Sequence, residues 1–522
     1  VIFAQMVDDP SAHPDIFPTE KKQEKERERL FSIIEDLVKW ENTTNEKVLQ
    51  QARDEIWQSW RYTCAENADH PRARELFDRH KLPAFHDPFA GGGSIPLEAQ
   101  RLGLESFASD LNPVAVLINK AMIEIPPKFA GKPPVNPEAR KNKELLKKEW
   151  KGAQGLAEDV RYYGKWMRDE AEKRIGHLYP KVEVTTEMAK DRPDLRQYVG
   201  QKLTVIAWLW ARTVKSPNPA FAGVDVPLAS TFMLSTKSGK EGFVEPVIDN
   251  RDYRFTVRVG KPKDPAAAKN GTKLARGANF KCLMSGAPMA ANYIKAEGKA
   301  GRMGARLMAI VAEGERGRVY IAPTQEHEAA AHKAMPEWKP ETPIAPDPRA
   351  LWTPPYGLIT YGDLFTPRQL VALTTFSDLV HEARERIRHD SVTAGPRDPS
   401  IDSRQADKPL RDGGLGATAY AEAVSAYLTL AVDRMANTIC TIARWTPERQ
   451  QTVTAFARQA IPMTWDFPDV NPFAGAAGDY VVSVDGVIKG ISSTTEPPGF
   501  AAQADASTQG ISQDKLMGSS KN

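Results

Sequence analysis

The stretch that decides the fold reads Asp87-Pro-Phe-Ala-Gly-Gly-Gly-Ser94, and Ser109-Asp-Leu-Asn-Pro113 follows it further along the chain. A short apolar run precedes the first stretch and predicts a buried strand, and a helical pattern comes after the glycines. A second short strand is expected over residues 105–108, so Asp110 lies at its carboxyl end, 23 residues after Asp87. A strand, a glycine turn, a helix and a second strand that ends in an acid predict a doubly wound α/β sheet.

The form of the glycine motif argues against a dinucleotide or triphosphate site. A dinucleotide motif needs a glycine three residues after Gly93, where this chain has Pro96, and no Gly-Lys-Ser follows. The carboxylate of Asp87 would repel a pyrophosphate but suits a cation or an α-amino group. S-adenosylmethionine (SAM) has an amino group, a sulfonium and ribose hydroxyls, and Asp110 is placed to bind the hydroxyls. The stretch therefore predicts a SAM site; the alternative is an ordinary strand–turn–helix with a glycine-rich loop.

The same two stretches resemble the SAM-binding motifs of amino-group DNA methyltransferases over Asp87–Ala99 and Ser109–Val116. More closely, the chain resembles the large prokaryotic adenine-specific DNA methylases of the DUF1156 family, which often lie among anti-phage genes. Further segments that resemble the family are Met6–Pro10, Lys39–Asn42, Trp208–Thr213, Ala296–Gly304, Gly362–Gln369, Trp465–Phe467 and Val470–Phe473. The resemblance implies a Rossmann-like SAM-dependent methyltransferase fold. It also implies methyl transfer to adenine N6 in double-stranded DNA, in a restriction or phage-defence setting with other defence proteins as further partners.

The catalytic motif that the resemblance implies is missing. Methylases of this kind use an Asp-Pro-Pro-Tyr type motif, whose acid and proline carbonyl accept hydrogen bonds from the target amino group and whose aromatic ring stacks on the flipped base. The nearest string is Thr353-Pro-Pro-Tyr356 in a proline-dense stretch, and we interpret it as part of a linker because threonine supplies no carboxylate. The family motif would come after Gln503–Ala506, and a family segment would precede Val1. We therefore expect a fragment of a longer methylase, truncated at both ends, with no catalytic residue of its own.

The cofactor-binding residues that we expect are Asp87, Pro88, Phe89, Ala90, Gly91, Gly93, Ser94, Asp110, Leu111, Asn112 and Asp505. Asp87 would lie near the methionine amino group of SAM, the loop through Gly93 would shape the pocket floor, and Asp110 would bind the ribose. The resemblance adds Asp505, at an acidic position that contacts the adenine moiety. The string Asn471-Pro-Phe-Ala-Gly475 repeats part of the glycine motif, and we interpret it as a coincidence because no periodic unit surrounds it.

Composition is that of a cytoplasmic enzyme. The 522 residues are 41% apolar and 26% charged, with three cysteines, which argues against a disulfide framework. No run of eighteen apolar residues occurs, so we expect no membrane span. The net charge of +3 permits nucleic-acid binding through a local patch without indicating it.

The domain organisation is expected to have an insertion. We expect N-terminal helices and the SAM-binding part over 1–125, a helical and β-ribbon insertion over 126–335, the rest of the methyltransferase domain over 336–508 with a flexible loop near 388–416, and a disordered tail over 509–522. In the insertion, charged helices are expected over 141–150 and 156–175, and strands over 203–210, 254–259 and 318–321. Elsewhere, Thr19 is expected to cap a helix that runs to Trp40, Thr43 and Glu46 to form a capping box for a helix through Trp60, and residues 417–445 to form a long helix.

The insertion resembles the family's zinc ribbon, but its ligands are missing. One cysteine-rich knuckle is replaced by Ser216–Phe221, and the other reads Cys282-Leu-Met-Ser285. A structural zinc site needs four N or S ligands, so a single thiol is insufficient. We expect a degenerate, metal-free ribbon that keeps its shape by packing and helps to engage DNA.

Three other functions stay open. A methyltransferase that acts on RNA or on protein glutamine would use the same SAM loop. A non-catalytic SAM-binding or DNA-binding protein would explain the missing acceptor motif. A nicotinamide oxidoreductase is disfavoured by Asp87 and by the absent third glycine.

Overall fold

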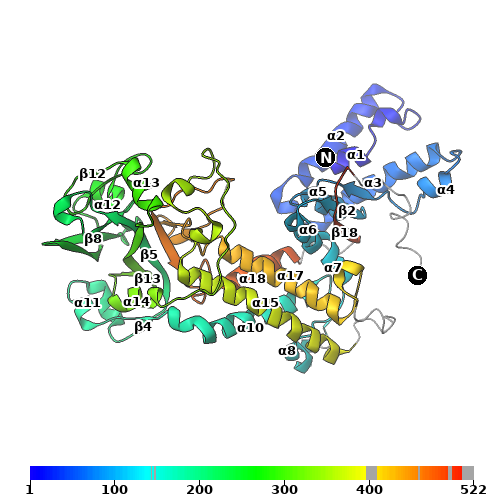
Figure 1. Ribbon diagram of the computed structural model, residues 1–522. Coiled ribbons are helices and arrows are strands. Elements are labelled where there is room, and N and C mark those ends of the chain that lie inside the picture. The colour runs from blue at the N-terminus through cyan, green and yellow to red at the C-terminus, as the bar shows by residue number, and fades with distance from the viewer. Residues whose placement is uncertain (143, 146–147, 396–407, 457–458, 492–496, 508–522) are drawn as a thin grey trace. The chain divides into compact units, whose positions relative to one another are not determined.

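The computed structural model describes residues 1–142, 144–145, 148–395, 408–456, 459–491 and 497–507 (Figure 1). The chain folds into two compact units: unit 1 comprises residues 1–162, 384–427 and 487–522, and unit 2 comprises residues 163–383 and 428–486. The chain passes from one unit to the other within α10 (Gln154–Ile175), α15 (Pro367–Ala394), α17 (Ala417–Ala436) and α18 (Tyr480–Ile491). The domain division expected from the sequence uses other boundaries and stays a prediction. Residues 396–407 of the loop expected near 388–416 and the whole of the expected tail (509–522) lie outside the described residues, whereas residues 388–394 are not a loop but the end of α15.

The N-terminal helices of unit 1 pack against the glycine-motif helix. They are α1 (Ile2–Met6), α2 (Glu20–Leu37) and α3 (Glu46–Glu66), with 3-10 turns η1 (Pro10–Ala12) and η2 (Trp40–Asn42), and the short helix α4 (Ala73–Leu76) follows them. The Thr19 side chain caps α2, as expected, by accepting a hydrogen bond from Lys22 N. Their shared core contains Ile33, Ala52, Ile56 and Leu102.

Two expectations about these helix ends were wrong. Helix α2 stops at Leu37 because the side-chain Nδ2 of Asn42 donates to Asp36 O (2.9 Å). Another helical turn would use this carbonyl for a backbone hydrogen bond. Thr43 and Glu46 form no capping box, because α3 begins at Glu46 after Asn45, and the Thr43 hydroxyl donates to Trp40 O (2.9 Å).

A three-stranded parallel sheet lies at the centre of unit 1. Its strands are β1 (Phe85–Asp87), β2 (Ser106–Asp110) and β18 (Gly499–Gln503), in the order β1-β2-β18, and α5 (Ser94–Arg101) connects the first two. Asp110 ends β2 as expected, opposite Gln503 of β18. Because the strands are parallel, their carboxyl ends share one edge, and mixed α/β structure is confirmed for this part of the chain (Figure 1).

Strand β18 docks against an irregular helix that follows β2. Helix α6 (Pro113–Asn119) continues as a π-helix, η3 (Lys120–Glu124), and then as α7 (Ile125–Lys128). The buried carboxylate of Glu124 is paired with the ammonium groups of Lys120 (2.9 Å) and Lys128 (2.6 Å) and accepts a hydrogen bond from Ala501 N (3.1 Å). A side chain at Gly499 would collide with the Ile123 backbone, so β18 needs glycine at this point.

The proline-rich segment after α7 is tied to α10 by a buried acid. Asp159 accepts hydrogen bonds from Val135 N (2.8 Å), from Asn136 N (2.9 Å) and from the Tyr420 hydroxyl (2.5 Å), all within unit 1. The helix expected over 141–150 is confirmed only in part, since residues 144–145 are helical, residues 148–150 are not, and residues 143, 146 and 147 lie outside the described residues. Helix α8 (Pro137–Lys141) ends before residues 144–145 because Asn142 is extended, and α10 confirms the second charged helix. Unit 1 also contains η9 (Leu410–Asp412).

Unit 2 is built on an antiparallel sheet of order β14-β13-β5-β17, with β6 beside β5. The strands are β5 (Val205–Lys215), β6 (Asp225–Leu228), β13 (Gly304–Gly314), β14 (Gly317–Ile321) and β17 (Asp466–Val470). Ten of the eleven residues of β5 are buried, so both faces of this strand are covered. Because β17 pairs with β5, this sheet crosses the boundary that the sequence suggested at residue 335.

Two smaller sheets adjoin the main sheet of unit 2. They are β7 (Met233–Ser235), β8 (Gly242–Asp249) and β9 (Asp252–Val259), and β10 (Lys273–Ala275), β11 (Asn279–Lys281) and β12 (Pro288–Met289), with helices α12 (Pro265–Asn270) and α13 (Ala291–Lys299). Strands β5, β9 and β14 confirm the expected strands. The two knuckle segments do come together, since Ser216 Oγ and Cys282 Sγ are 3.2 Å apart.

The other elements of unit 2 are short. They are α11 (Thr186–Lys190), α14 (Gln325–His332), β3 (Val182–Glu183), β4 (Lys202–Leu203), β15 (Arg444–Thr446), β16 (Gln451–Val453), η4 (Gly176–Leu178), η5 (Pro193–Tyr198), η6 (Pro219–Phe221), η7 (Pro354–Tyr356) and η8 (Tyr361–Leu364). Helix α17 ends at Ala436, so the long helix expected over 417–445 is confirmed only in its first part. No helix in the described ranges combines the length and apolar character needed to cross a membrane.

A buried arginine joins α15 to the main sheet of unit 2. Arg368 is fully buried, and its guanidinium pairs with Asp469 of β17 (2.8 Å) and lies 4.1 Å from the ring centre of Trp208 in β5. The Trp208 indole N–H in turn donates to Nδ1 of His327 (2.8 Å). These four side chains connect the sheet to the first turn of α15 and to α14.

Candidate functional site

The glycine loop leaves β1 through a tight turn. Oδ1 of Asp87 accepts a hydrogen bond from Phe89 N (3.0 Å), and Ala90 N donates to Ser109 O of the neighbouring strand (3.0 Å). Gly91 then has a φ of +49°, a left-handed conformation that favours glycine. The loop is therefore held at both ends, by its own acid and by β2.

Gly93 is required by its backbone and by its surroundings. Its φ is +75°, and a Cβ there would lie 2.5 Å from Oδ1 of Asn119 and 2.5 Å from Cε of Met122. Gly92 differs, because a Cβ at this position would meet no atom within 4 Å. The middle of the loop therefore faces open space, while Gly93 packs on α6 and the π-helix.

Asp110 connects the second strand to the loop. Its Oδ2 accepts from Gly91 N (2.9 Å) and its Oδ1 from Asn112 N (2.8 Å). These backbone hydrogen bonds, that from Asn112 first, lower the pKa of the Asp110 carboxyl. An ionised carboxylate oxygen accepts more than one hydrogen bond, so Asp110 keeps capacity for two hydroxyl donors of a ligand.

The end of β18 completes the same edge of the sheet. Ala504 N donates to Asp110 O (3.1 Å), and the Gln503 side chain donates to Leu111 O (2.9 Å). Asp505 follows two residues after β18, and its Oδ1 accepts from Ser507 Oγ and N, which lower its pKa. The structure thus brings Asp87, Asp110 and Asp505 to the carboxyl ends of three adjacent strands.

Apolar side chains around this edge are unusually exposed. Phe89 is 78% exposed, Leu111 63% and Val114 57%, although all three are large hydrophobic residues. Phe89 and Leu111 are expected from the sequence, but Val114 is not, because a short helix would ordinarily bury its apolar face. Exposed apolar side chains beside hydrogen-bond acceptors suit a ligand with an aromatic ring.

Asn119 is a further residue of this site that is not expected from the sequence. This buried residue donates from Nδ2 to Gly91 O (3.1 Å) and to Ala115 O (2.9 Å), so it connects the glycine loop to α6. The available signal was an amide at the end of an apolar run, Val114 to Ile118, where a buried polar group needs a specific partner.

Two motif-like strings, Thr353–Tyr356 and Asn471–Gly475, belong to unit 2. Thr353 is fully buried, and the Tyr356 ring packs edge-on against Trp465 (5.0 Å between ring centres). A side chain at Gly298 of α13 would collide with Tyr356 O, so this string is packed against α13. In the second string, Asn471 follows β17 and donates to Val205 O (2.7 Å).

Among the described residues, no group of three or more His, Cys, Asp and Glu side chains lies close enough together to hold a metal ion. In the two segments that correspond to the zinc knuckles, Cys282 is buried, and Ser216 Oγ lies at hydrogen-bond distance from its sulfur. The shape of this ribbon is maintained by such hydrogen bonds and by the packing of Phe280 and Met289 around it.

One comparison with known proteins concerns this part of unit 1. Residues 71–160 match the family model of the D12 class N6 adenine-specific DNA methyltransferases. The methyltransferase match contains β1, the glycine loop, β2 and the π-helix, and it supports methylation of adenine in DNA. Adenine DNA methyltransferases normally use S-adenosylmethionine and have DNA as their substrate. The chain has no significant match among curated proteins or among solved structures.

Proposed function

We propose that unit 1 carries the SAM-binding site of a Rossmann-like methyltransferase that modifies adenine N6 in DNA. The observation that carries the proposal is the hydrogen bond from Gly91 N to Asp110 Oδ2 (2.9 Å), which joins the glycine loop to the acid at the end of the next strand. This is the edge of a parallel α/β sheet where ligands bind. The match over residues 71–160 supports the same class of reaction.

The residues present fit SAM. Asp110 would accept hydrogen bonds from the ribose hydroxyls, and the exposed rings and chains of Phe89 and Leu111 would lie against the adenine. Asp87 would be near the α-amino group, and Gly92 leaves room for close approach to the backbone. When bound, SAM supplies an electrophilic methyl group on its sulfonium. Asp505 would contact the adenine moiety from the end of β18.

The acceptor side of the reaction is not proposed from these residues. The chain has no Asp-Pro-Pro-Tyr, and the Thr353 string packs within unit 2. A non-catalytic SAM- or DNA-binding role is the second candidate function, because the string nearest to the acceptor motif, Thr353 to Tyr356, has no carboxylate and packs against α13. The resemblance to DUF1156 methylases supports a restriction or phage-defence setting for either function.

Calorimetric titration with SAM tests the donor site. We expect wild type to bind SAM, and Asp110→Ala to lose about 100-fold or more in affinity, because two ribose hydrogen bonds to a charged group are removed, each worth roughly 1.5–3 kcal/mol. Asp54→Ala, an exposed acid on α3 in the same unit, is the matched control and should bind as wild type does. Unchanged affinity in Asp110→Ala, or binding of NAD without SAM, would contradict the proposal.

Methyl transfer separates the candidate acceptors. With radiolabelled SAM, label in duplex DNA that appears as N6-methyladenine is the expected result for the methyltransferase. Label in RNA or in protein would identify one of the other acceptors. SAM binding without transfer to any of them would favour the non-catalytic role.

A further inference from the structure

One segment of unit 2 is far more basic than the rest of the chain. Residues 237–306 contain 15 of the 70 Lys and Arg residues but only 6 of the 67 Asp and Glu residues. The segment therefore carries a formal charge of +9, although the whole chain carries +3. It forms β8 to β12, α12 and α13, and α12, β8 and β12 lie at one end of unit 2 (Figure 1). The small net charge of the whole chain therefore includes one strongly positive segment.

Most of these cations have no carboxylate beside them. Within the described chain, only Arg258, Arg302 and Arg306 of this segment form ion pairs, with Glu245, Glu297 and Asp252. The exposed cations without such a partner include Arg251, Arg254, Lys261, Lys263, Lys269 and Arg276. In contrast, Arg27 and Arg29 of α2 each pair with two carboxylates. Unpaired like charges repel one another, so a surface of this kind indicates an anionic partner.

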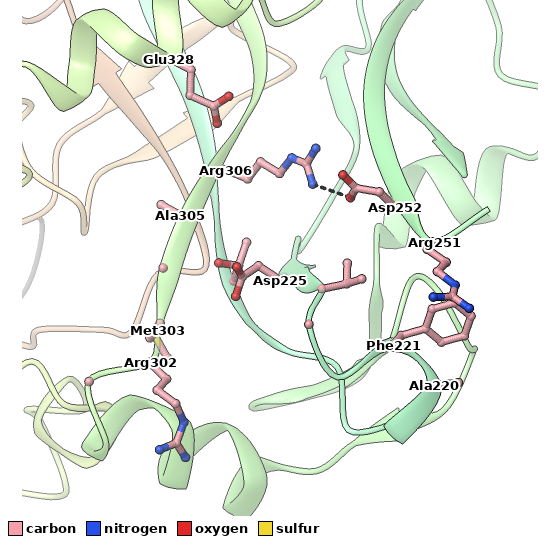
Figure 2. Close-up of a pocket in the computed structure, with 15 residues that line it drawn as sticks. Ala220, Phe221, Asp225, Arg251, Asp252, Arg302, Met303, Ala305, Arg306 and Glu328 are labelled. Carbon is pink, nitrogen blue, oxygen red and sulfur yellow. Dashed lines mark hydrogen bonds and ion pairs between the residues drawn. The ribbon is translucent and has the colours of Figure 1, made fainter. Parts of the chain in front are cut away.

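An open groove of about 940 Å³ adjoins this basic segment (Figure 2). Its walls come from the β5–β6 connection, the β8–β9 turn, the loop before β13 and α14. Arg251 and Arg302 lie on opposite sides of the groove in Figure 2. The groove therefore has a cation on each side.

The acids of the groove are already occupied. Asp225 accepts from Lys215 Nζ (2.9 Å), Asp252 pairs with Arg306 (3.2 Å; Figure 2), and Glu328 accepts from Leu307 N (3.3 Å). They therefore repel an incoming anion less than three free carboxylates would. The guanidinium of Arg251 remains available for an anion. So does Nη1 of Arg302, because its Nε and Nη2 donate to Glu297.

The turn between β8 and β9 presents Arg251 at its tip. Asp249 pairs with Asp252 across the hairpin, so the connection is the two residues Asn250 and Arg251. Asn250 has a φ of +46°, as such tight hairpins require. Arg251 is consequently displayed by a rigid turn rather than by a long loop, which lowers the entropic cost of holding a contact.

From these observations we infer that the groove and the basic segment bind the sugar–phosphate backbone of duplex DNA, with Arg251 contacting a phosphate at the groove. The choice of DNA rests on the proposed function, since the methyltransferase match supports a DNA substrate. Phosphate contacts of this kind position a protein on DNA without reading its sequence. Unit 2 would thus supply affinity for the substrate, while unit 1 would bind the methyl donor.

Fluorescence anisotropy with a labelled DNA duplex, over a series of NaCl concentrations, tests this inference. Each phosphate contact contributes a slope of about 0.9 in the dependence of log K on log[salt], or roughly 8-fold in affinity at 0.1 M salt. We expect Arg251→Ala to lower the slope by about 1 and to weaken binding about 5- to 10-fold. Arg251→Glu and the double variant Lys261→Ala/Lys263→Ala should weaken it further.

Arg196 provides the matched control. Arg196 is exposed in η5, two residues before Tyr198. The Tyr198 hydroxyl accepts from Glu315 N, which follows the last residue of β13, whereas the groove lies at the first residues of β13. The eleven residues of β13 separate these ends by roughly 33 Å. Arg196→Ala and Arg196→Glu should therefore leave the slope and the affinity nearly unchanged, and circular dichroism should show all variants folded.

The outcomes distinguish this inference from the proposed function. SAM binding with duplex affinity that is equal in the Arg251 and Arg196 variants would overturn the inference and leave the proposed donor site intact. Duplex binding that depends on Arg251, without SAM binding, would overturn the donor site alone. Binding of heparin but not of DNA, or tighter binding of duplex RNA than of DNA, would also overturn the inference.

Discussion

Gly91 N donates a hydrogen bond to Oδ2 of Asp110, at 2.9 Å, across 19 residues of chain. The two motifs that stood apart in the sequence are therefore one structure, in which the conformation of the glycine loop depends on the acid at the end of β2. Asn119 supports the loop from the opposite side through Gly91 O (3.1 Å). Substitutions in this small network should separate effects on loop shape from effects on general stability.

Adjacent glycines should respond very differently to alanine. Gly93→Ala places a methyl group 2.5 Å from the Asn119 side chain in a backbone with φ of +75°, so we expect a loss of about 2 kcal/mol or more in the free energy of unfolding. Gly92→Ala meets no atom within 4 Å and should unfold like wild type. Urea unfolding of both variants checks this, and an equal effect of the two substitutions would contradict the account of the loop.

The buried pair of Arg368 and Asp469 should be costly to break on one side only. Arg368→Met leaves Asp469 buried without its partner, so we expect a loss of about 3–5 kcal/mol in the free energy of unfolding. The double variant Arg368→Met/Asp469→Leu removes both charges and should recover most of that loss. A double-mutant cycle measured by chemical unfolding checks the coupling, and additive losses would show that the two side chains act independently.

His327 should make unit 2 less stable in acid. Burial first, and then the positive charge of Arg368, lower the pKa of His327 to about 4, whereas the unfolded chain has an ordinary value near 6.5. The unfolded state therefore binds more protons between pH 6.5 and pH 4. The stabilising contribution is complete above about pH 6.5 and is lost as the pH falls toward 4, by up to about 3 kcal/mol.

Unfolding measured at pH 7.5 and at pH 5.0 checks the role of His327. The control is His327→Gln, which does not titrate and keeps an acceptor for the Trp208 indole N–H. The difference in stability between the two pH values should be smaller in this variant than in wild type. If both proteins lose stability equally at pH 5.0, another group is responsible.

The ribbon around Cys282 should be indifferent to chelators. Ser216 Oγ lies 3.2 Å from the cysteine sulfur, so hydroxyl and thiol groups occupy the two facing segments. We expect no stoichiometric zinc in the purified protein and the same thermal midpoint with and without EDTA. Stoichiometric zinc by atomic absorption, or a lower midpoint in EDTA, would refute the metal-free ribbon.

Local features were predictable where local interactions dominate. The strand, glycine turn and acid of the first motif follow from an apolar run and from backbone conformations that only glycine adopts easily. The prediction of a capping box at Thr43 was wrong because other partners lie within three residues. Asn45 takes the N-cap position of α3, and the Thr43 hydroxyl donates to Trp40 O instead. The pairing of β18 with β2, and of β17 with β5, joins segments hundreds of residues apart and has no local signal.

The repeated string shows most clearly what sequence and tertiary structure each decide. Asn471 accepts from Phe473 N (3.0 Å) just as Asp87 accepts from Phe89 N (3.0 Å), and Gly475 and Gly91 both have positive φ. The turn is thus determined by the sequence alone, because an Asx side chain and a glycine set it within five residues.

Burial, however, is decided only by the fold. Phe473 is 7% exposed within the core of unit 2, whereas Phe89 is 78% exposed at the open edge of a parallel sheet. Local hydrogen bonds shape a turn wherever it occurs, but the distant strands that pack around it determine whether a ligand can reach it. The sequence determined the two turns. The tertiary structure decided that the Asp87 turn lies on an exposed edge, whereas the acid that accepts from Gly475 N in the other turn, Asp479, is buried.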